Sequence, residues 1–266
     1  VVLGLLMVFP QIFLRAWRWH LLMKMQGIEY PLKDAVPVDF AGLFAGTFTP
    51  GRLGDFIKVQ YLREKGYSFG KSFLSVLLDR CYDLAILILF GYMSILYFIQ
   101  RFSHLTLVFS TILVLIPVLG IIFYVTGIIT RERISRFITS LSPKRYRDIF
   151  LKTLSDFLSD LSLLKIRPLI YAAMATLVTW FLYYVMAYFF ALALSIPVPF
   201  LYLAGCVSIS AFITLLPVSI SGIGTRDATF ILLFGYIGIA SESAVAYSAL
   251  ILLMYAVNGL SGFIAW

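Results

Sequence analysis

The last 99 residues of the chain, after Arg167, contain only three charged side chains: Arg226, Asp227 and Glu242. Soluble domains carry about 25% charged residues, so this region is too apolar for a water-exposed surface. Two of the three charges are adjacent and follow the helix-breaking segment 217–225. A charge in hydrocarbon costs roughly 2.5–3.5 kcal/mol on insertion scales, and irregular backbone is tolerated there only inside protein or beside a wet cavity. The pattern predicts a polar site enclosed by membrane-spanning helices.

The whole chain has the composition of an integral membrane protein, because 61% of its 266 residues are hydrophobic and only 13% are charged. Its net charge of +8 is concentrated in residues 129–167 and between Arg15 and Lys71. Such clustering is typical of cytoplasmic loops, so we expect no nucleic-acid partner. The sequence lacks a P-loop, a nucleophile elbow and paired Cys or His residues at metal-ligand spacing. We therefore expect no cofactor, no metal and no catalytic residue.

Apolar segments divide into two lengths. Five of them approach the about 20 residues that a membrane-spanning helix needs: 1–20, 72–99, 105–128, 168–194 and 243–266. Two are shorter, and they end at Pro50 and Pro217: residues 35–50 and 200–216. Residues 35–50 give about 24 Å of helix against a hydrocarbon core of about 30 Å. We interpret each short segment as a half-helix that enters the membrane, breaks and turns back.

Charge placement then gives an orientation. With the basic loop 129–167 in the cytoplasm, both ends of 24–71 lie on that side, whereas 200–237 dips in from the other side. The expected fold is an all-α polytopic bundle in the cell membrane, with two inverted repeats that each contain a re-entrant broken-helix hairpin. Its parts are a first repeat (1–128), a cytoplasmic loop with an amphipathic interfacial helix (129–167) and a second repeat (168–266). Broken helices in inverted repeats are characteristic of secondary transporters.

The tip of the second hairpin combines helix breakers with charges: Pro217, Gly222, Gly224, Arg226 and Asp227. Glycines permit close backbone approach, and a helix that restarts near Thr225 would direct its N–H groups, together with Arg226, at a phosphate or carboxylate. The alternative is that Arg226 and Asp227 only pair with each other and hold the hairpin.

The first tip has the matching residues Pro50, Gly51, Arg52, Gly54 and Asp55. These charges form either a binding site or a tip that lies close to the cytoplasmic surface, where charges are inexpensive.

A third group, Asp79, Arg80 and Asp83, lies within the apolar span 72–99. Asp79 and Asp83 share a helix face, and Arg80 can reach Asp83 at a spacing of three. We expect these side chains to face the bundle interior and to meet Arg52 or Asp55, as a static ion network or as a ligand-responsive one.

Four motifs in this order carry a family resemblance: RAWRWHLL at 15–22, FTPGRLGD at 48–55, DRCYD at 79–83 and LPVSISGIGTRD at 216–227. Together they resemble the lysylphosphatidylglycerol synthase transmembrane-region family, which includes the flippase half of the multiple peptide resistance factor and stand-alone flippase-like proteins. The resemblance covers nearly the whole chain. It implies that the protein moves an anionic phospholipid or polyprenyl-phosphate-linked headgroup across the membrane, or supports an enzyme that uses one.

The family pattern maps onto both tips and onto the acidic-Arg pair, at Pro217, Gly222, Gly224 and Asp227, at Pro50, Gly54 and Asp55, and at Asp79 and Arg80. Two departures stand out: the family commonly has Glu where Asp55 and Asp227 stand, and often an Arg in the last span, where this chain has residues 250–255. A site without that Arg would prefer a different headgroup. The soluble aminoacyl-transfer domain of the full synthases is absent from this sequence, so lipid aminoacylation is not implied.

Three hypotheses follow for function. In a lipid translocase, Arg52, Arg80 and Arg226 attract the phosphate, while Asp55, Asp83 and Asp227 hold these arginines. In a membrane-embedded enzyme acting on polyprenyl phosphates, Asp79 or Asp55 would be the base. In a scaffold, the amphipathic helix at 146–165 would dock a membrane or soluble glycosyltransferase. We favour the translocase, with the lipid headgroup and the bilayer as its partners.

Overall fold

The computed structural model describes residues 1–97, 166–215 and 219–265, and within these ranges all regular structure is helical. This confirms the all-α prediction. The helices are α1 (Val2–Leu6), α2 (Val8–Met25), α3 (Leu32–Phe48), the 3₁₀ helix η1 (Pro50–Phe56), α4 (Ile57–Glu64), α5 (Phe69–Tyr97), α8 (Ile166–Ala193), α9 (Phe200–Thr214), α10 (Thr225–Gly235) and α11 (Ser241–Ala265). The expected span 105–128, the amphipathic helix and Pro217 lie outside the described residues.

Each long apolar segment that the structure describes forms a long helix or a helix pair. Segment 1–20 corresponds to α1 and α2, which are interrupted only at Met7, and the other three described segments correspond to α5, α8 and α11. By length and composition, two helices in the described ranges could cross a membrane, namely Ile166–Ala193 and Ser241–Leu260. The third long helix, α5, has 29 residues but carries Asp79, Arg80 and Asp83 in its interior.

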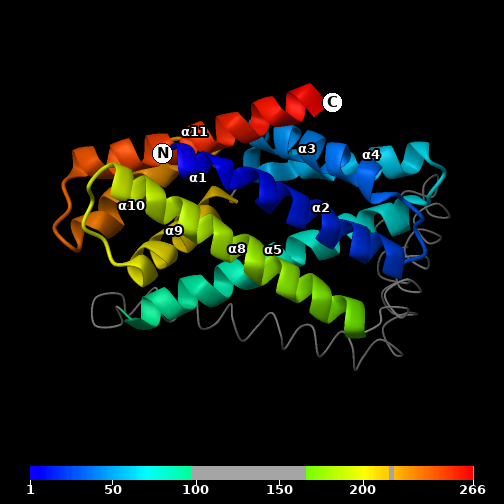
Figure 1. Cartoon of the computed structure of the whole chain (residues 1–266), viewed down its shortest axis with the longest axis horizontal. Helices are drawn as coiled ribbons and strands as arrows, with labels where there is room; N and C mark the ends of the chain where they lie inside the picture. The colour runs from blue at the N-terminus through cyan, green and yellow to red at the C-terminus, as the bar shows by residue number, and fades with distance from the viewer. Residues whose placement is uncertain (98–165, 216–218, 266) are drawn as a thin grey trace, which may run out of the picture.

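These helices form an elongated bundle (Figure 1). Helix α3 packs along α11, α2 packs along α8, and α5 packs along α9. The larger apolar core, between α8, α9, α10 and α11, contains fully buried Phe190, Phe234 and Tyr247. A smaller core around Trp19 and Leu62 joins α2, α3, α4 and α5. Among the described residues, the fully buried charged side chains are Arg18, Asp39, Asp55, Lys58, Asp79 and Arg226.

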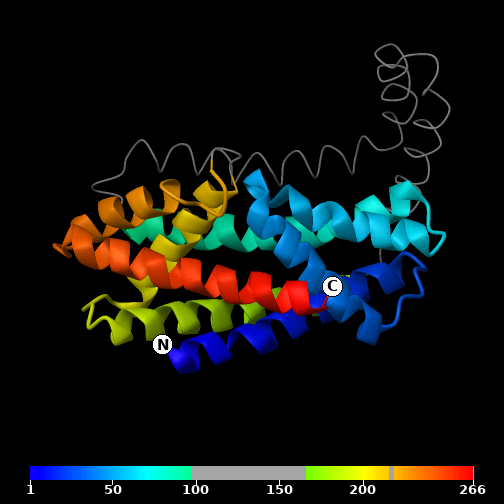
Figure 2. The same ribbon diagram turned by 90° about the horizontal axis from the view of Figure 1, so that it is seen from above.

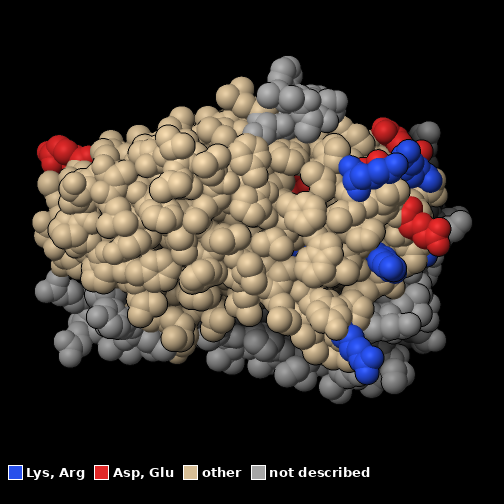
Figure 3. Space-filling model, viewed as in Figure 1, with Lys and Arg blue, Asp and Glu red and all other residues tan. Residues whose placement is uncertain are grey.

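Exposed charges gather at the ends of the bundle. On the face drawn in Figure 3, Lys and Arg gather at one end, and the middle of the face is almost entirely uncharged, with only a small recessed acidic patch. The exposed charged residues at that end lie where α2 and α4 finish and where α3 and α8 begin: Lys24, Glu29, Lys33, Arg63, Glu64, Lys65 and Arg167. Helix α8 instead presents apolar side chains outward, including Met174 and Phe181, each 57% exposed. An apolar side surface suits contact with lipid.

The first broken helix reverses direction immediately after Pro50. Helix α3 ends at Phe48, and Gly51 and Arg52 take left-handed φ angles of 62° and 56° before η1 leads into α4. Gly54 lies so close to α3 that a Cβ there would be 2.2 Å from the carbonyl carbon and oxygen of Ala45. Its N–H donates to Thr49 Oγ1 at 2.6 Å. The turn therefore depends on glycine at position 54.

The second broken helix has a different turn. Helix α9 ends at Thr214 and α10 begins at Thr225, where the sequence predicted a restart. The Gly224 N–H donates to Asp227 Oδ2 at 3.0 Å, which caps the new helix. Figure 2 shows that α3–α4 and α9–α10 are V-shaped pairs that open toward opposite ends of the bundle.

Candidate functional site

Eight charged side chains form a network between α2, α3, η1, α4 and α5. The cations are Arg15, Arg18, Lys58 and Arg80, and the anions are Asp39, Asp55, Asp79 and Asp83. Asp79 is at the centre and is fully buried. Its carboxylate lies 2.7 Å from Arg18 Nη2, 2.8 Å from Arg80 Nη2 and 3.5 Å from Lys58 Nζ.

The sequence pattern of α5 explains why two carboxylates face one guanidinium. Asp79 and Asp83 are one turn apart, and Arg18 donates to each of them at 2.8 Å. Arg80 lies 3.3 Å from Asp83 and donates to Asp55 on η1 at 2.8 Å. The expected contacts of Arg80 with Asp83 and of this group with Asp55 are therefore present. Because Asp55 belongs to the first hairpin tip, the network ties that tip to α5.

Small residues on α3 make room for these charges. Lys58 and Asp39 are both fully buried and hydrogen-bonded to each other, and Lys58 Nζ lies 4.8 Å from the Trp19 ring centroid. A Cβ at Gly42 would be 2.9 Å from the Lys58 side chain, and one at Gly46 would be 3.2 Å from Asp55 Oδ1. The glycines on this face of α3 thus allow two charged side chains to lie flat against the helix.

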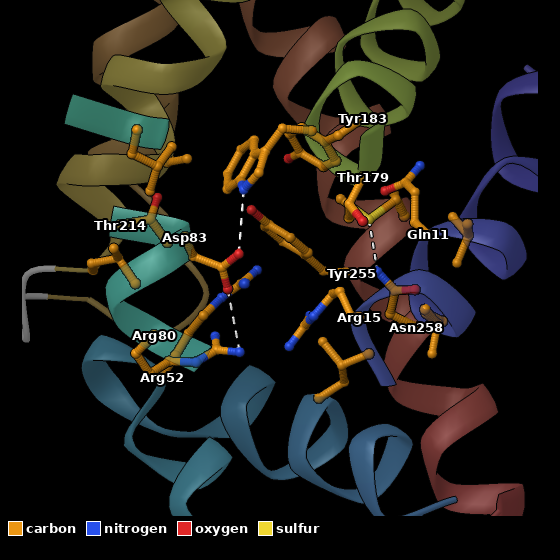
Figure 4. A pocket seen from close by; sticks show the side chains of 18 residues that line it. Gln11, Arg15, Arg52, Arg80, Asp83, Thr179, Tyr183, Thr214, Tyr255 and Asn258 are labelled. Atoms are coloured by element: carbon orange, nitrogen blue, oxygen red, sulfur yellow. Dashed lines mark hydrogen bonds and ion pairs between the residues drawn. The ribbon is translucent and has the colours of Figure 1, made fainter. Parts of the chain in front are cut away.

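Next to the network is a cavity of about 90 Å³. Its wall combines apolar side chains with three arginines, Arg15, Arg52 and Arg80, and one carboxylate, Asp83. Figure 4 shows these four side chains converging near Tyr255. The remaining polar lining comes from Gln11, Thr179, Trp180, Tyr183, Thr214 and Asn258. A pocket with excess arginine has the chemistry that suits an anion with several oxygens, such as phosphate.

Three donor atoms of the arginines that line the cavity are buried and lack an acceptor among the described residues. They are Nε and Nη2 of Arg15 and Nε of Arg80. Among the described residues, the carboxylate within 4 Å of Arg15 is that of Asp39, whose Oδ2 is 3.9 Å from Arg15 Nε and beyond hydrogen-bond distance. Arg52 lies 5.0 Å from the Tyr255 ring centroid, in a cation–π arrangement. Buried donors of this kind are costly unless an acceptor satisfies them, so they favour binding of an oxyanion.

Arg226 and Asp227 form a separate cluster at the second tip. Arg226 donates to Ser248 Oγ at 2.7 Å and to the Ser221 carbonyl at 3.1 Å, and its Nη2 lies 3.7 Å from Asp227. Ser248 also donates to Asp227. These contacts stay within the tip and α11, so they correspond to the alternative in which the pair holds the hairpin. The Arg226 guanidinium lies 5.8 Å from the Tyr255 ring centroid.

The structure thus brings together one part of the candidate set and separates another. Arg52, Asp55, Asp79, Arg80 and Asp83 lie in or beside the cavity. The glycines and proline of the two tips shape the turns: Pro50, Gly51, Gly54, Gly222 and Gly224. A Cβ at Gly222 would be 2.6 Å from Thr214 Oγ1, so this glycine allows the second tip to lie against the end of α9.

Sequence reasoning missed four charged residues of the network. The sequence placed Arg15, Arg18 and Lys58 in the charged stretch between Arg15 and Lys71 and gave them no role in a site, whereas Arg18 and Lys58 are at most 1% exposed and lie in the interior. Carboxylates on other helices compensate the charges of these two side chains. Asp39 drew no attention although it lies within the apolar half-helix 35–50. The signal in the sequence was a carboxylate inside an apolar segment, three residues before Gly42, a glycine that leaves room for a charged side chain.

Within the described residues, a helical bundle with an apolar side surface and an ion network in its interior defines a membrane protein with a buried polar site. The chain belongs to the family described as lysylphosphatidylglycerol synthase TM region, which it matches over residues 1–262, and this confirms the resemblance drawn from the motifs. Family membership places the protein among membrane proteins with a lipid-related function.

Two archaeal relatives are similar over most of their length. The UPF0104 membrane protein MJ1595 of Methanocaldococcus jannaschii is 26% identical, over 98% of this chain and 82% of the relative. The UPF0104 membrane protein PH1989 of Pyrococcus horikoshii is 24% identical, over 94% of this chain and 81% of the relative. No solved structure matches the chain.

Proposed function

We propose that the protein is a lipid translocase, which moves an anionic phospholipid or polyprenyl-phosphate-linked headgroup across the membrane. The cavity lined by Arg15, Arg52 and Arg80 carries this proposal, because it is an arginine-rich pocket within an apolar bundle. The headgroup phosphate occupies the cavity, and the acyl or prenyl tails stay in the bilayer. Family membership supports a lipid as the ligand.

The side chains of the network have distinct roles in this proposal. Arg52 and Arg15 bind the phosphate oxygens, and Arg80 contributes its free Nε. Asp55, Asp79 and Asp83 hold Arg80 in position through contacts of 2.8, 2.8 and 3.3 Å. Because the donors are positioned before the ligand arrives, little ordering is required on binding.

The V-shaped helix pairs are re-entrant hairpins in this proposal. They enter the bilayer from opposite sides as parts of two inverted repeats (1–128 and 168–266), and their tips meet near its midplane. In this proposal the α4 end of the bundle, with its exposed charges, faces the cytoplasm, the side assigned to the loop 129–167. Rocking of one repeat against the other would open the cavity to each side in turn.

Reconstitution into liposomes tests the proposal. Purified protein should speed the movement of a fluorescently labelled anionic phospholipid between leaflets, measured by dithionite quenching. Arg52→Gln should lower this rate by about tenfold or more, because a charged donor to the phosphate is lost. The matched control is Arg63→Gln, which removes the same charge from an exposed position on α4.

Equal rates for the parent, Arg52→Gln and empty liposomes would refute transport. Stimulation of a separate glycosyltransferase without lipid movement would identify the alternative, a scaffold or transferase subunit. Within the described ranges, no three His, Cys, Asp or Glu side chains are grouped as metal ligands.

A further inference from the structure

The charges in the centre of the bundle do not balance. Among the described residues, five cations meet there: the four of the network and Arg52. They face four carboxylates, Asp39, Asp55, Asp79 and Asp83. Arg226 and Asp227, in the neighbouring cluster, cancel each other. The centre therefore carries one excess positive charge, which is unfavourable in a low-dielectric surrounding unless an anion neutralises it.

Proton transfer within the network leaves this balance unchanged. Lys58 and Asp39 are hydrogen-bonded to each other and fully buried, and moving a proton between them does not alter their sum. Among the described residues, Arg52 has no ion pair within 4 Å and Arg15 has one at 3.9 Å, so the excess lies on the cavity side of the network, where both are located. A ligand with one negative charge restores neutrality, whereas a dianion would overshoot and a zwitterion would leave the excess in place.

The cavity also lacks a place for an ammonium group. Among the residues that line it, the one carboxylate is Asp83. Its Oδ1 already accepts hydrogen bonds from Arg18 at 2.8 Å and Trp180 at 3.3 Å, and its Oδ2 is 3.3 Å from Arg80. A second cationic group on the ligand would meet three arginines and no uncommitted carboxylate. Like charges in a desolvated site are strongly unfavourable.

The cavity wall also contains neutral polar side chains that can bind uncharged groups of a ligand. Thr179, Thr214 and Asn258 line the cavity, and Asn258 Oδ1 is buried without a hydrogen-bond donor among the described residues. Thr214 donates to the Ser210 carbonyl at 2.8 Å, which leaves its own oxygen free to accept. Hydroxyl groups of a ligand can supply the donors that these oxygens need.

From the charge balance and this lining, we infer that the cavity selects the singly charged phosphodiester of a small uncharged polyol. Headgroups that carry an amine, and phosphomonoesters with two charges, are disfavoured. This inference rests on the proposed function only in taking the ligand to be a membrane lipid. The recognition itself follows from one excess positive charge, unsatisfied arginine donors and an unsatisfied amide acceptor.

The inference is tested by measuring the binding of lipids to the purified full chain in nanodiscs made of an uncharged lipid. The probes are short-chain phosphatidylglycerol, phosphatidylcholine, lysyl-phosphatidylglycerol and phosphatidic acid, measured by thermal shift and by displacement of labelled phosphatidylglycerol. Phosphatidylglycerol should bind at least about tenfold more tightly than each of the others, because it alone carries the single negative charge that neutralises the excess. Phosphatidylcholine has no net charge, phosphatidic acid approaches two negative charges, and the lysyl lipid carries a net positive charge. Equal binding of phosphatidylglycerol and phosphatidylcholine, or preference for the lysyl lipid, would overturn it.

Two substitutions of Arg52 test whether the excess positive charge sets the lipid preference. Arg52→Gln brings the centre to neutrality, so the preference for phosphatidylglycerol over phosphatidylcholine should fall to within about threefold, whereas Arg52→Lys should retain it. Arg63→Gln is the matched exposed control and should keep the parental preference. An unchanged preference in Arg52→Gln would contradict the assignment.

Two further measurements identify the source of the ligand and distinguish this inference from the proposed transport function. Glycerophosphoglycerol, which has the same headgroup without acyl chains, should compete only weakly; strong competition would identify a soluble phosphodiester as the ligand. Selective binding of phosphatidylglycerol without lipid movement in liposomes would support this inference and refute transport. Movement of all lipids at equal rates, with no selective binding, would do the reverse.

Discussion

Ser221 donates a hydrogen bond from its hydroxyl to the carbonyl oxygen of Thr47. Ser221 lies at the tip of the second broken helix and Thr47 near the end of α3, so this bond joins tips that are 174 residues apart in the sequence. Ser221 has a left-handed φ of 53°, a conformation that non-glycine residues rarely adopt. Backbone strain at such a contact is typical of segments that switch between arrangements.

If the repeats rock during transport, the contact between the tips must break. Cysteines at positions 47 and 221, introduced as Thr47→Cys and Ser221→Cys in a chain with Cys81 and Cys206 replaced by Ala, can be joined with a short bifunctional thiol reagent. We expect the crosslink to stop lipid movement in liposomes. The same chain before crosslinking, and each single-cysteine chain after treatment, should remain active. Full activity of the crosslinked chain would show that the tips do not part.

Arg52 is placed in a left-handed conformation that costs about 1–2 kcal/mol for a non-glycine residue. Arg52→Gly relieves this cost but removes the cation–π contact with Tyr255, which is worth about 0.5–1 kcal/mol. The variant should therefore unfold at the parental temperature or slightly higher, while lipid movement is lost. Thermal unfolding in detergent, paired with the liposome assay, measures both. A marked loss of thermal stability would mean that Arg52 has mainly a structural role.

Gly54→Ala should destabilise the first tip. The added methyl would lie 2.2 Å from backbone atoms of Ala45, and neither backbone can move without disturbing η1 or α3. Overpacking of this kind costs about 1–3 kcal/mol. Gly235→Ala is a suitable control, since a Cβ there would meet nothing within 4 Å. Parental stability of the Gly54 variant in detergent unfolding would show that the tip is looser than the structure indicates.

The buried pair of Lys58 and Asp39 should respond differently to single and double replacement. Lys58→Met alone leaves Asp39 buried with Arg15 3.9 Å away as its remaining cation, so we expect a loss of about 3–5 kcal/mol. Adding Asp39→Leu removes the uncompensated charge and should restore most of that stability. A double-mutant cycle of unfolding free energies gives the coupling. Additive effects in that cycle would show that the two side chains do not depend on each other.

Particular residues show how far sequence reasoning reaches into the site. Asp79, Arg80 and Asp83 could be placed in the interior because they share one helix, and helix geometry fixes which of them meet. The break after Pro50 and the restart at Thr225 were also predictable, because proline and glycine act locally. Arg15 was not recognised, since the same arginine at the end of a span is a surface residue unless another helix covers it.

The two tip arginines, Arg52 and Arg226, have different roles that the sequence alone could not distinguish. From sequence, Arg52 and Arg226 are equivalent, each beside glycines and an acid. In the folded chain Arg226 is bonded to Ser248 of α11, whereas Arg52 faces the cavity and Tyr255. Tyr255 lies in the part of the last span where the family often has an arginine, and it touches both guanidinium groups through its ring.

The amino-acid sequence by itself determined that this chain is helical, apolar along its spans, broken at two short segments and related to a lipid-associated membrane family. These properties depend on composition, on local backbone preferences and on motifs in order. Only the tertiary structure decided which charges neutralise one another and which arginine donors remain for an anion. The physical reason is that charge compensation acts through space over a few ångströms, between helices whose contacts no local pattern specifies.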